Sequence, residues 1–87
     1  MKNKEIIANA AVKARMMSAA EARSMVENGR DIPLHTLQGW NLRGNYRIKD
    51  GEEPIEVKLW KKKENGGFYL AKAYLYRRNQ KSFVARW

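Results

Sequence analysis

Apolar residues recur at helical spacing through the first third of the chain. From Lys4 to Asn28 the sequence is rich in Ala, Met, Glu, Lys and Arg and contains neither Pro nor Gly, a composition typical of helices. An apolar stripe at i, i+3/i+4, i+7 spacing consists of Ile6, Ile7, Ala10, Ala14 and Met17. We therefore expect helical structure here, with this stripe facing the core.

Local capping signals divide this region into two helices. Ser18 and Glu21 have the spacing of a capping box, in which the Ser18 oxygen accepts a hydrogen bond from the Glu21 amide while the Glu21 side chain reaches back. The first predicted helix covers about residues 4–16 and the second about 18–28, with Gly29 as a left-handed cap. One continuous helix is the alternative.

A short third helix is predicted after Pro33. Thr36 is a suitable N-cap and Gly44 a suitable end, although Gly39 weakens the helical pattern between them. The apolar residues of this segment are Leu37, Trp40 and Leu42. We expect Trp40 to be a core residue that joins the helix to a sheet.

After Gly44 the pattern changes from helical to alternating. Asp50-Gly51 predicts a turn, with Gly51 at positive φ, between residues 46–49 and the next apolar segment. In that segment Ile55, Val57 and Leu59 alternate with Glu56, Lys58 and Trp60. Asn65-Gly66 is a strong hairpin signal and leads into a predicted strand over Phe68–Arg77.

The two faces of this last long strand differ in character. The more core-like face carries Tyr69, Ala71, Ala73 and Leu75, and the opposite face carries Phe68, Leu70, Lys72, Tyr74 and Tyr76. Core packing or cross-strand pairing is the expected role of Phe68 and Leu75. A short edge strand can follow at Phe83, Val84 and Trp87.

Together these patterns predict an α+β fold in which N-terminal helices pack on a small antiparallel β-sheet containing a central hairpin. We expect a single small domain over residues 1–87, helical over 4–43 and antiparallel β over 46–84. The patterns leave open whether the helices pack on the hairpin of the same chain or pair with a second copy.

The composition excludes several classes of site. The chain has 87 residues, no Cys and one His, which excludes disulfides, thiolate catalysis and Cys-rich or His-rich metal sites. We expect a local turn or packing role for His35. No nucleophile and base pattern and no phosphate-binding glycine motif is found, so we expect neither enzymatic activity nor a cofactor. Without a long apolar run or a signal peptide, the expected location is cytoplasmic, with no membrane partner.

The charge is strongly positive and unevenly distributed. Lys and Arg outnumber Asp and Glu by 18 to 9, and residues 61–87 hold eight basic and one acidic side chain. Cations that follow phosphates, interleaved with rings that stack on bases, are typical of single-stranded nucleic-acid binding. The predicted binding residues are Trp60, Lys61, Lys62, Lys63, Lys72, Tyr74, Tyr76, Arg77, Arg78 and Lys81. The alternative interpretation is that the aromatic residues form core pairs and the lysines keep a hairpin soluble.

One part of the chain is similar to a known family. The segment Thr36-Leu37-Gln38-Gly39-Trp40 is followed by Gly44, by Ile48-Lys49-Asp50-Gly51-Glu52-Glu53-Pro54-Ile55, and by an aromatic strand closing at Gln80. In this order the features resemble the N-terminal single-stranded-DNA-binding domain of ArdC-type antirestriction proteins, over about half the chain. The resemblance implies a stand-alone binding module encoded by a phage, plasmid or other mobile element. Full-length family members continue into a metallopeptidase-like domain with a His-Glu-x-x-His zinc motif that this sequence lacks, so no peptidase activity is implied.

A protein-binding function is the alternative hypothesis. An antirestriction or host-takeover protein that binds a host protein would use the same residues, because Trp, Tyr and Arg are enriched at interface hot spots. The basic charge argues against DNA mimicry, which requires an acidic surface.

Overall fold

Two helices form the N-terminal part of the fold in the computed structural model, which describes residues 1–83. α1 (Asn3–Lys13) and α2 (Ala19–Glu27) are separate, which excludes one continuous helix. Ser18 Oγ accepts a hydrogen bond from the Glu21 amide at 3.1 Å, as predicted. The returning contact differs from the prediction, because the Glu21 carboxylate accepts from the Ser18 hydroxyl at 3.2 Å. Capping chemistry thus sets the start of α2.

Both helices are shorter than predicted. α1 ends where Arg15 adopts φ 59°, and the Met16 amide then donates back to the Ala11 carbonyl. Gly29 has φ 66° after α2 and is the predicted left-handed cap. The predicted helical stripe is wrong in part, since Ala14 and Met17 lie beyond the end of α1, although Met17 still packs against the core.

The buried residues of α1 are small because the helix packs on two sides. It contacts α2 on one side and a sheet strand on the other. The buried positions are Ala8, Ala10 and Ala11, while Ile6 and Ile7 are only half-buried. Alanine allows the close approach of both neighbours, so small residues rather than large ones occupy the centre of this contact.

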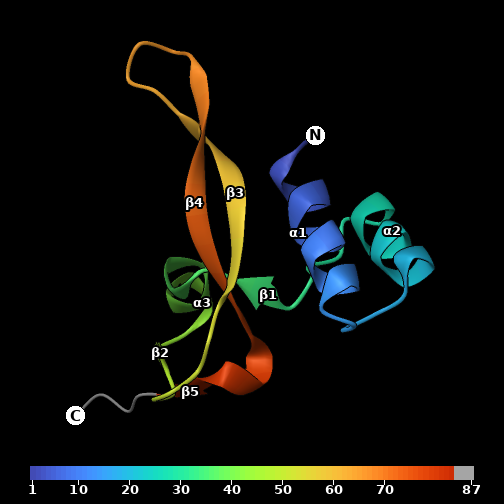
Figure 1. Cartoon of the computed structure of the whole chain (residues 1–87), viewed down its shortest axis with the longest axis vertical. Helices are drawn as coiled ribbons and strands as arrows, with labels where there is room; N and C mark the ends of the chain where they lie inside the picture. The colour runs from blue at the N-terminus through green and yellow to red at the C-terminus, as the bar shows by residue number, and fades with distance from the viewer. Residues whose placement is uncertain (84–87) are drawn as a thin grey trace.

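A three-stranded antiparallel sheet has its longest strand in the middle. β4 (Phe68–Arg77) lies between β1 (Leu34–His35) and β3 (Ile55–Lys62). Figure 1 shows this sheet beside α1 and α2, so the predicted α+β fold with N-terminal helices is confirmed. β1 corrects the prediction that residues 4–43 are helical, because Leu34 and His35 pair with Arg77 and Tyr76. Two residues are too few to show a strand period, so only the pairing defines this strand.

α3 (Leu37–Arg43) connects β1 to the second sheet. Thr36 Oγ1 accepts from the Gly39 amide at 3.0 Å, which confirms the predicted N-cap. Gly44 ends the helix in an extended conformation, and a Cβ on Gly44 would lie 2.5 Å from Cε2 of Tyr46. A side chain at position 44 would therefore require the Tyr46 ring to move.

A second, two-stranded sheet closes the base of the fold. β2 (Tyr46–Ile48) pairs with β5 (Lys81–Phe83), which follows the short 3-10 helix η1 (Arg78–Gln80). The turn at Asp50-Gly51 forms with Gly51 at φ 78°, as predicted, although the strands on its two sides pair with other partners. Phe83 thus belongs to a short strand, whereas the predicted extension to Val84 and Trp87 lies outside the described residues.

Trp40 joins α3 to the central strand, as predicted. Its side chain is buried, and its indole N–H donates to the Tyr76 carbonyl at 2.8 Å. The ring meets the His35 ring edge-on, with centroids 4.7 Å apart. This contact fixes the base of β4 against the helix.

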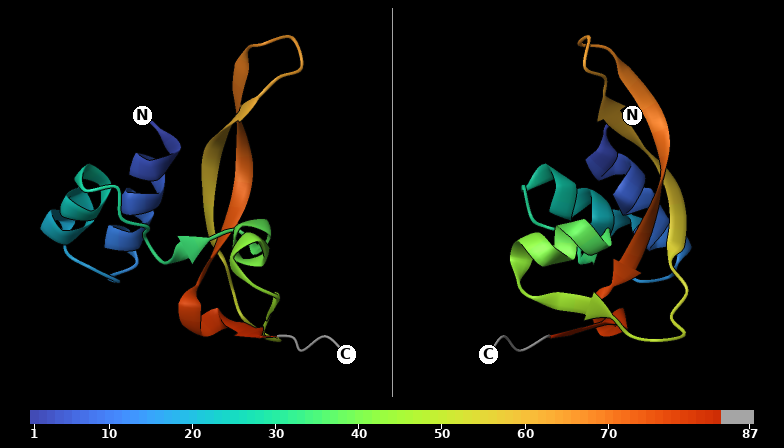
Figure 2. Two further views of the ribbon diagram at one scale, coloured as in Figure 1. Left: turned by 180° about the vertical axis from the view of Figure 1, so that it is seen from behind. Right: turned by 90° about the vertical axis from the view of Figure 1, so that its left-hand side faces the viewer.

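The core lies between the helices and the lower half of the sheet. It consists of Ala8, Ala10, Ala11, Ala22, Ile32, Leu34 and Leu75, with Ile55, Val57 and Leu59 packed against it. Leu75 and Ala73 are buried, as the face analysis predicted. The views in Figure 2 show that the β3–β4 hairpin continues past the helices. Because α1 contacts both α2 and β3, the helices pack on the hairpin of their own chain.

Candidate nucleic-acid interface

The upper part of the β3–β4 hairpin is an arm that projects from the rest of the molecule. We define the arm as residues 58–72, and every residue from 60 to 70 is exposed. At its tip the Lys63 amide donates to the Gly67 carbonyl at 2.6 Å, and the Gly66 amide donates to the Lys63 carbonyl at 3.1 Å. Gly66 has φ 93°, so the predicted Asn-Gly hairpin forms with glycine in the position that requires positive φ.

One face of the arm combines large apolar side chains with lysines, and we call it the outer face. Cross-strand neighbours share a face and lie about 5 Å apart. The register places Trp60 opposite Leu70, Lys62 opposite Phe68 and Lys58 opposite Lys72. Trp60 is 40% exposed, Leu70 46% and Phe68 64%. Such apolar exposure, rimmed by charge, is typical of an interaction site.

The opposite face of the arm, the inner face, carries the remaining tip lysines. Lys61 is opposite Tyr69, and Lys63 follows at the turn. Tyr69 belongs to the same face as the buried Ala73 and Leu75, yet it is 43% exposed. The expectation that Tyr69 packs with the core is therefore wrong, because the helices end before this part of the strand.

Phe68 pairs across the hairpin with Lys62 and is exposed because it lies on the outer face, whereas element lengths explain the exposure of Tyr69 on the inner face. α1 has 11 residues and is about 16 Å long, since each residue rises about 1.5 Å. β4 has 10 residues and extends about 33 Å at about 3.3 Å each. A helix of this length covers about half of such a strand, so one end of β4 stays uncovered. The lengths do not tell which end of β4 is covered, so only the structure adds Lys58, Phe68, Tyr69 and Leu70 to the candidate binding residues.

Tyr74 and Lys72 continue the outer face below the arm's aromatic tip. Tyr74 is 46% exposed and lies opposite Glu56. Lys72 Nζ is 3.8 Å from a Glu56 carboxylate oxygen, and both side chains are more than half exposed. A surface pair of this kind contributes little to stability, so Lys72 remains free to exchange Glu56 for another anion.

The other predicted binding residues lie at the base, away from the arm's tip. Tyr76 is half-buried in the pair with β1, while Arg77 and Arg78 are exposed where β4 ends. Lys81 is half-buried, with Nζ 3.6 Å from the centroid of the Tyr46 ring and 4.8 Å from that of Trp40. The structure thus brings together Trp60, Lys61, Lys62, Lys63 and Lys72 and separates Tyr76, Arg77, Arg78 and Lys81 from them.

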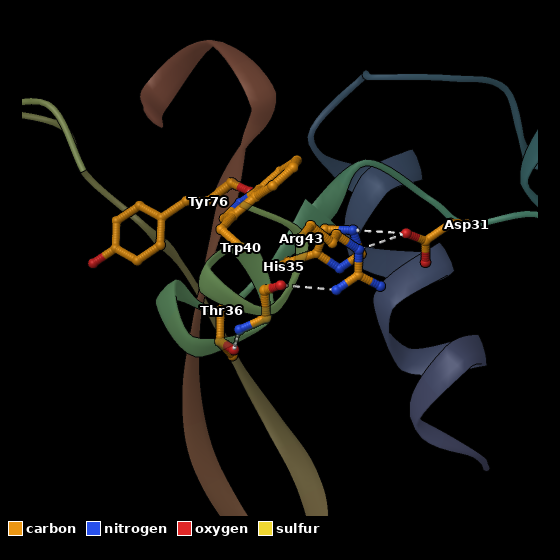
Figure 3. Close-up of polar contacts among 7 residues, drawn as sticks. Asp31, His35, Thr36, Trp40, Arg43 and Tyr76 are labelled. Atoms are coloured by element: carbon orange, nitrogen blue, oxygen red, sulfur yellow. Dashed lines mark hydrogen bonds and ion pairs between the residues drawn. The ribbon is translucent and has the colours of Figure 1, made fainter. Parts of the chain in front are cut away.

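His35 belongs to a charged cluster that holds β1 against α3. Its Nε2 lies 3.1 Å from Asp31 Oδ2, which is also 2.9 Å from Nε of Arg43 (Figure 3). Arg43 Nη1 donates to the Gly39 carbonyl at 2.8 Å, so the cluster ties the loop before β1 to the helix after it. This agrees with the predicted packing role of His35.

The electrostatics of this cluster favour a neutral imidazole. Burial is the largest cause that lowers the pKa of His35, and the positive charges of Arg43 and Arg78 add to it, while Asp31 opposes the shift. For Asp31, burial acts to raise the pKa, but the hydrogen bond from Arg43 and the charges of His35 and Arg43 outweigh it and lower the pKa. These groups bind one another and present no nucleophile.

Comparisons with known proteins leave the function to be argued from the site itself. No family model, curated protein or solved structure matches this chain. Within residues 1–83, no helix is long and apolar enough to cross a membrane, and no group of three or more His, Cys, Asp or Glu side chains is placed to hold a metal ion. What distinguishes the molecule is its exposed arm.

Proposed function

We propose that this protein is a small module that binds single-stranded DNA with little sequence preference, and that the arm is its contact surface. The observation that carries the proposal is the arm itself, in which Trp60, Phe68 and Tyr69 are exposed among lysines on an uncovered hairpin. As predicted from the sequence, exposed rings would stack on bases. These rings lie nearer the tip of the hairpin than the predicted binding residues at the base, Tyr76, Arg77, Arg78 and Lys81.

The charge of the hairpin supports a polyanionic ligand. Residues 55–77 contain six basic and two acidic side chains. Glu56, one of the two acids, is already close to Lys72. In the described chain Lys58, Lys61, Lys62 and Lys63 form no ion pair, so they are available for phosphates. The exposed Arg77 and Arg78, where β4 ends, extend this positive surface to the base.

The exposed rings favour a single strand over a duplex. Stacking on an aromatic side chain stabilises a bound base by roughly 1–3 kcal/mol and tolerates any base, since each has a π-face. In a duplex these faces are already stacked on neighbouring pairs. Trp60, Phe68 and Tyr74 on the outer face would stack, while the lysines follow the backbone. The resemblance of residues 36–80 to the DNA-binding domain of ArdC-type antirestriction proteins supports the same ligand and an origin in a mobile element.

Fluorescence anisotropy with a labelled, mixed-sequence single strand and its duplex tests the proposal. If the four unpaired lysines each contact one phosphate, the slope of log K against log salt is about −2.8, and raising salt from about 50 to about 200 mM weakens binding roughly 50-fold. We expect the single strand to bind more tightly than the duplex. Equal binding to both refutes the stacking role, and absence of binding redirects the search to a protein partner of the same surface.

Matched variants separate stacking from general charge attraction. Phe68→Ala should weaken single-strand binding by about 1 kcal/mol or more, because one stacking platform is lost. Leu42→Ala is the control, since Leu42 is 81% exposed on α3 and lies outside the arm. Lys62→Ala should reduce the salt slope by about 0.7, the value for one phosphate contact, and Lys4→Ala on α1 should not. Equal effects of arm and control variants contradict a defined interface.

A further inference from the structure

The outer edge of β3 is covered by the side chain of one residue from α1. Within residues 1–83, β3 is an edge strand of its sheet, and no strand lies beside its outward backbone groups. At Trp60, the backbone N–H donates to Asn3 Oδ1 at 2.8 Å and the carbonyl accepts from Asn3 Nδ2 at 3.1 Å. One carboxamide therefore makes the two bonds that the backbone of an added strand would make.

The same segment also holds the Trp60 ring. The indole N–H donates to the Met1 carbonyl at 2.9 Å. Three hydrogen bonds thus join two segments that lie 57 to 59 positions apart in the sequence. Figure 1 shows the N-terminus beside β3, where the arm leaves the helices. Trp60 keeps 40% of its surface exposed, while its polar atom is satisfied within the chain.

We propose that Asn3 is a positioning residue that fixes the root of the arm and holds the Trp60 ring ready for a ligand. With its N–H turned to Met1, the indole offers the ligand its ring face and no hydrogen-bond donor. A surface of this kind stacks on any base and discriminates among none of them. The part of this inference that concerns the ligand rests on the proposed function, whereas the clamp itself does not.

The clamp also explains how a long edge strand is kept from pairing with other chains. In an antiparallel pair, outward and inward backbone groups alternate, so Lys58 and Lys62 point their N–H groups to the same side as Trp60. In the described chain these two positions carry no carboxamide clamp, and each instead has a charged side chain, which is a common protection of edge strands. Asn3 protects position 60 between these two lysines, where the side chain is the apolar ring of Trp60 and carries no charge.

Amide hydrogen exchange measured residue by residue by NMR on the full chain tests the clamp without any ligand. In the wild type the Trp60 amide should exchange at least tenfold more slowly than the outward amides of Lys58 and Lys62. Asn3→Ala should remove most of this protection, about tenfold, which corresponds to about 1.4 kcal/mol. The Leu59 amide, which points to β4, should keep its rate.

Two further variants distinguish the clamp from a general effect on α1. Asn3→Asp favours the helix start through the helix dipole and keeps an acceptor for the Trp60 amide, but it loses the donor to the Trp60 carbonyl. We expect intermediate protection from it. Asn41→Ala, an exposed helical asparagine on α3, should leave Trp60 exchange unchanged. If Trp60 already exchanges as fast as Lys62 in the wild type, or if all arm amides accelerate together in Asn3→Ala, the clamp does not exist.

Binding measurements then address the positioning role. Asn3→Ala should weaken single-strand binding about threefold to tenfold while retaining the wild-type salt slope, because no phosphate contact is lost. Unchanged affinity in a variant that has lost Trp60 protection overturns the positioning role. If the wild type binds no DNA at all, the proposed function fails, and the exchange data still decide whether Asn3 fixes the arm.

Discussion

Gln80 provides a sharp test of what holds the base of the molecule together. It is the residue at which η1 turns into β5, and it is 3% exposed. Its Oε1 accepts from the Arg77 amide at 2.7 Å, and its Nε2 donates to the Glu53 carbonyl at 2.8 Å and to a Glu52 carboxylate oxygen at 3.3 Å. The side chain thus joins the end of β4 to the loop that precedes β3.

The expected cost of removing these bonds follows from their number and burial. Gln80→Met keeps a similar volume and removes both short bonds, which leaves the Arg77 N–H and the Glu53 carbonyl without this partner. Each buried polar group left unsatisfied costs about 1–3 kcal/mol. The cost here lies towards the lower end of that range, because Arg77 and Glu53 are exposed residues and water can reach their backbone groups. The expected loss is about 2–3 kcal/mol in the free energy of unfolding. For a domain of this size that lowers Tm by roughly 10–20 °C.

Gln80→Glu separates the acceptor from the donor. The new carboxylate still accepts from Arg77, but it turns an oxygen towards the Glu53 carbonyl and the Glu52 carboxylate. We therefore expect Gln80→Glu to be destabilised at neutral pH, where the carboxyl is charged, and to regain stability on acidification, because the protonated carboxyl can again donate to the Glu53 carbonyl.

Thermal and urea denaturation of Gln80→Met, Gln80→Glu and the control Asn79→Ala measure these effects. Asn79 is exposed in the same turn, so its replacement should stay within about 0.5 kcal/mol of the wild type. The reasoning is refuted if Gln80→Met loses less than about 1 kcal/mol, or if Gln80→Glu is as stable as the wild type at neutral pH.

Other positions allow simpler predictions. Gly51→Ala should cost about 1–2 kcal/mol because φ is 78°, whereas Gly67→Ala, without a positive φ, should be near neutral; thermal melts that rank them in the opposite order contradict this. Arg15→Gly should raise the free energy of unfolding by about 1 kcal/mol in urea melts, because Arg15 adopts φ 59°, which is strained for a residue with a side chain. A loss of stability in this variant would show that contacts of the Arg15 side chain outweigh the backbone strain. Burial is the main cause of the lowered pKa of His35, so the unfolded chain takes up the proton first as pH falls below about 6.5; stability should decrease from there towards the folded-state pKa. Urea melts across this range should show a smaller decrease for His35→Gln, and an equal decrease in both proteins would refute the assignment.

Several features were predictable because they depend on residues a few positions apart. The caps at Ser18 and Thr36, the positive φ at Gly29 and the Asn65-Gly66 turn each follow from local backbone chemistry, and the structure contains all of them. The alternation in β4 also identified its faces correctly at Ala73 and Leu75.

The sequence by itself therefore determined the helices, the hairpin, the two faces of β4 and the positive charge at its end. Only the tertiary structure decided which part of each face is covered. Tyr69 and Leu75 lie on the same face of an alternating strand, yet one is 43% exposed and the other fully buried. The same holds for Asn3 and Trp60, whose pairing across 57 positions leaves no local signal. The periodicity of a strand is a property of its backbone and therefore fixes the direction of each side chain. Whether that side chain is buried depends on which distant segment of the chain packs against it.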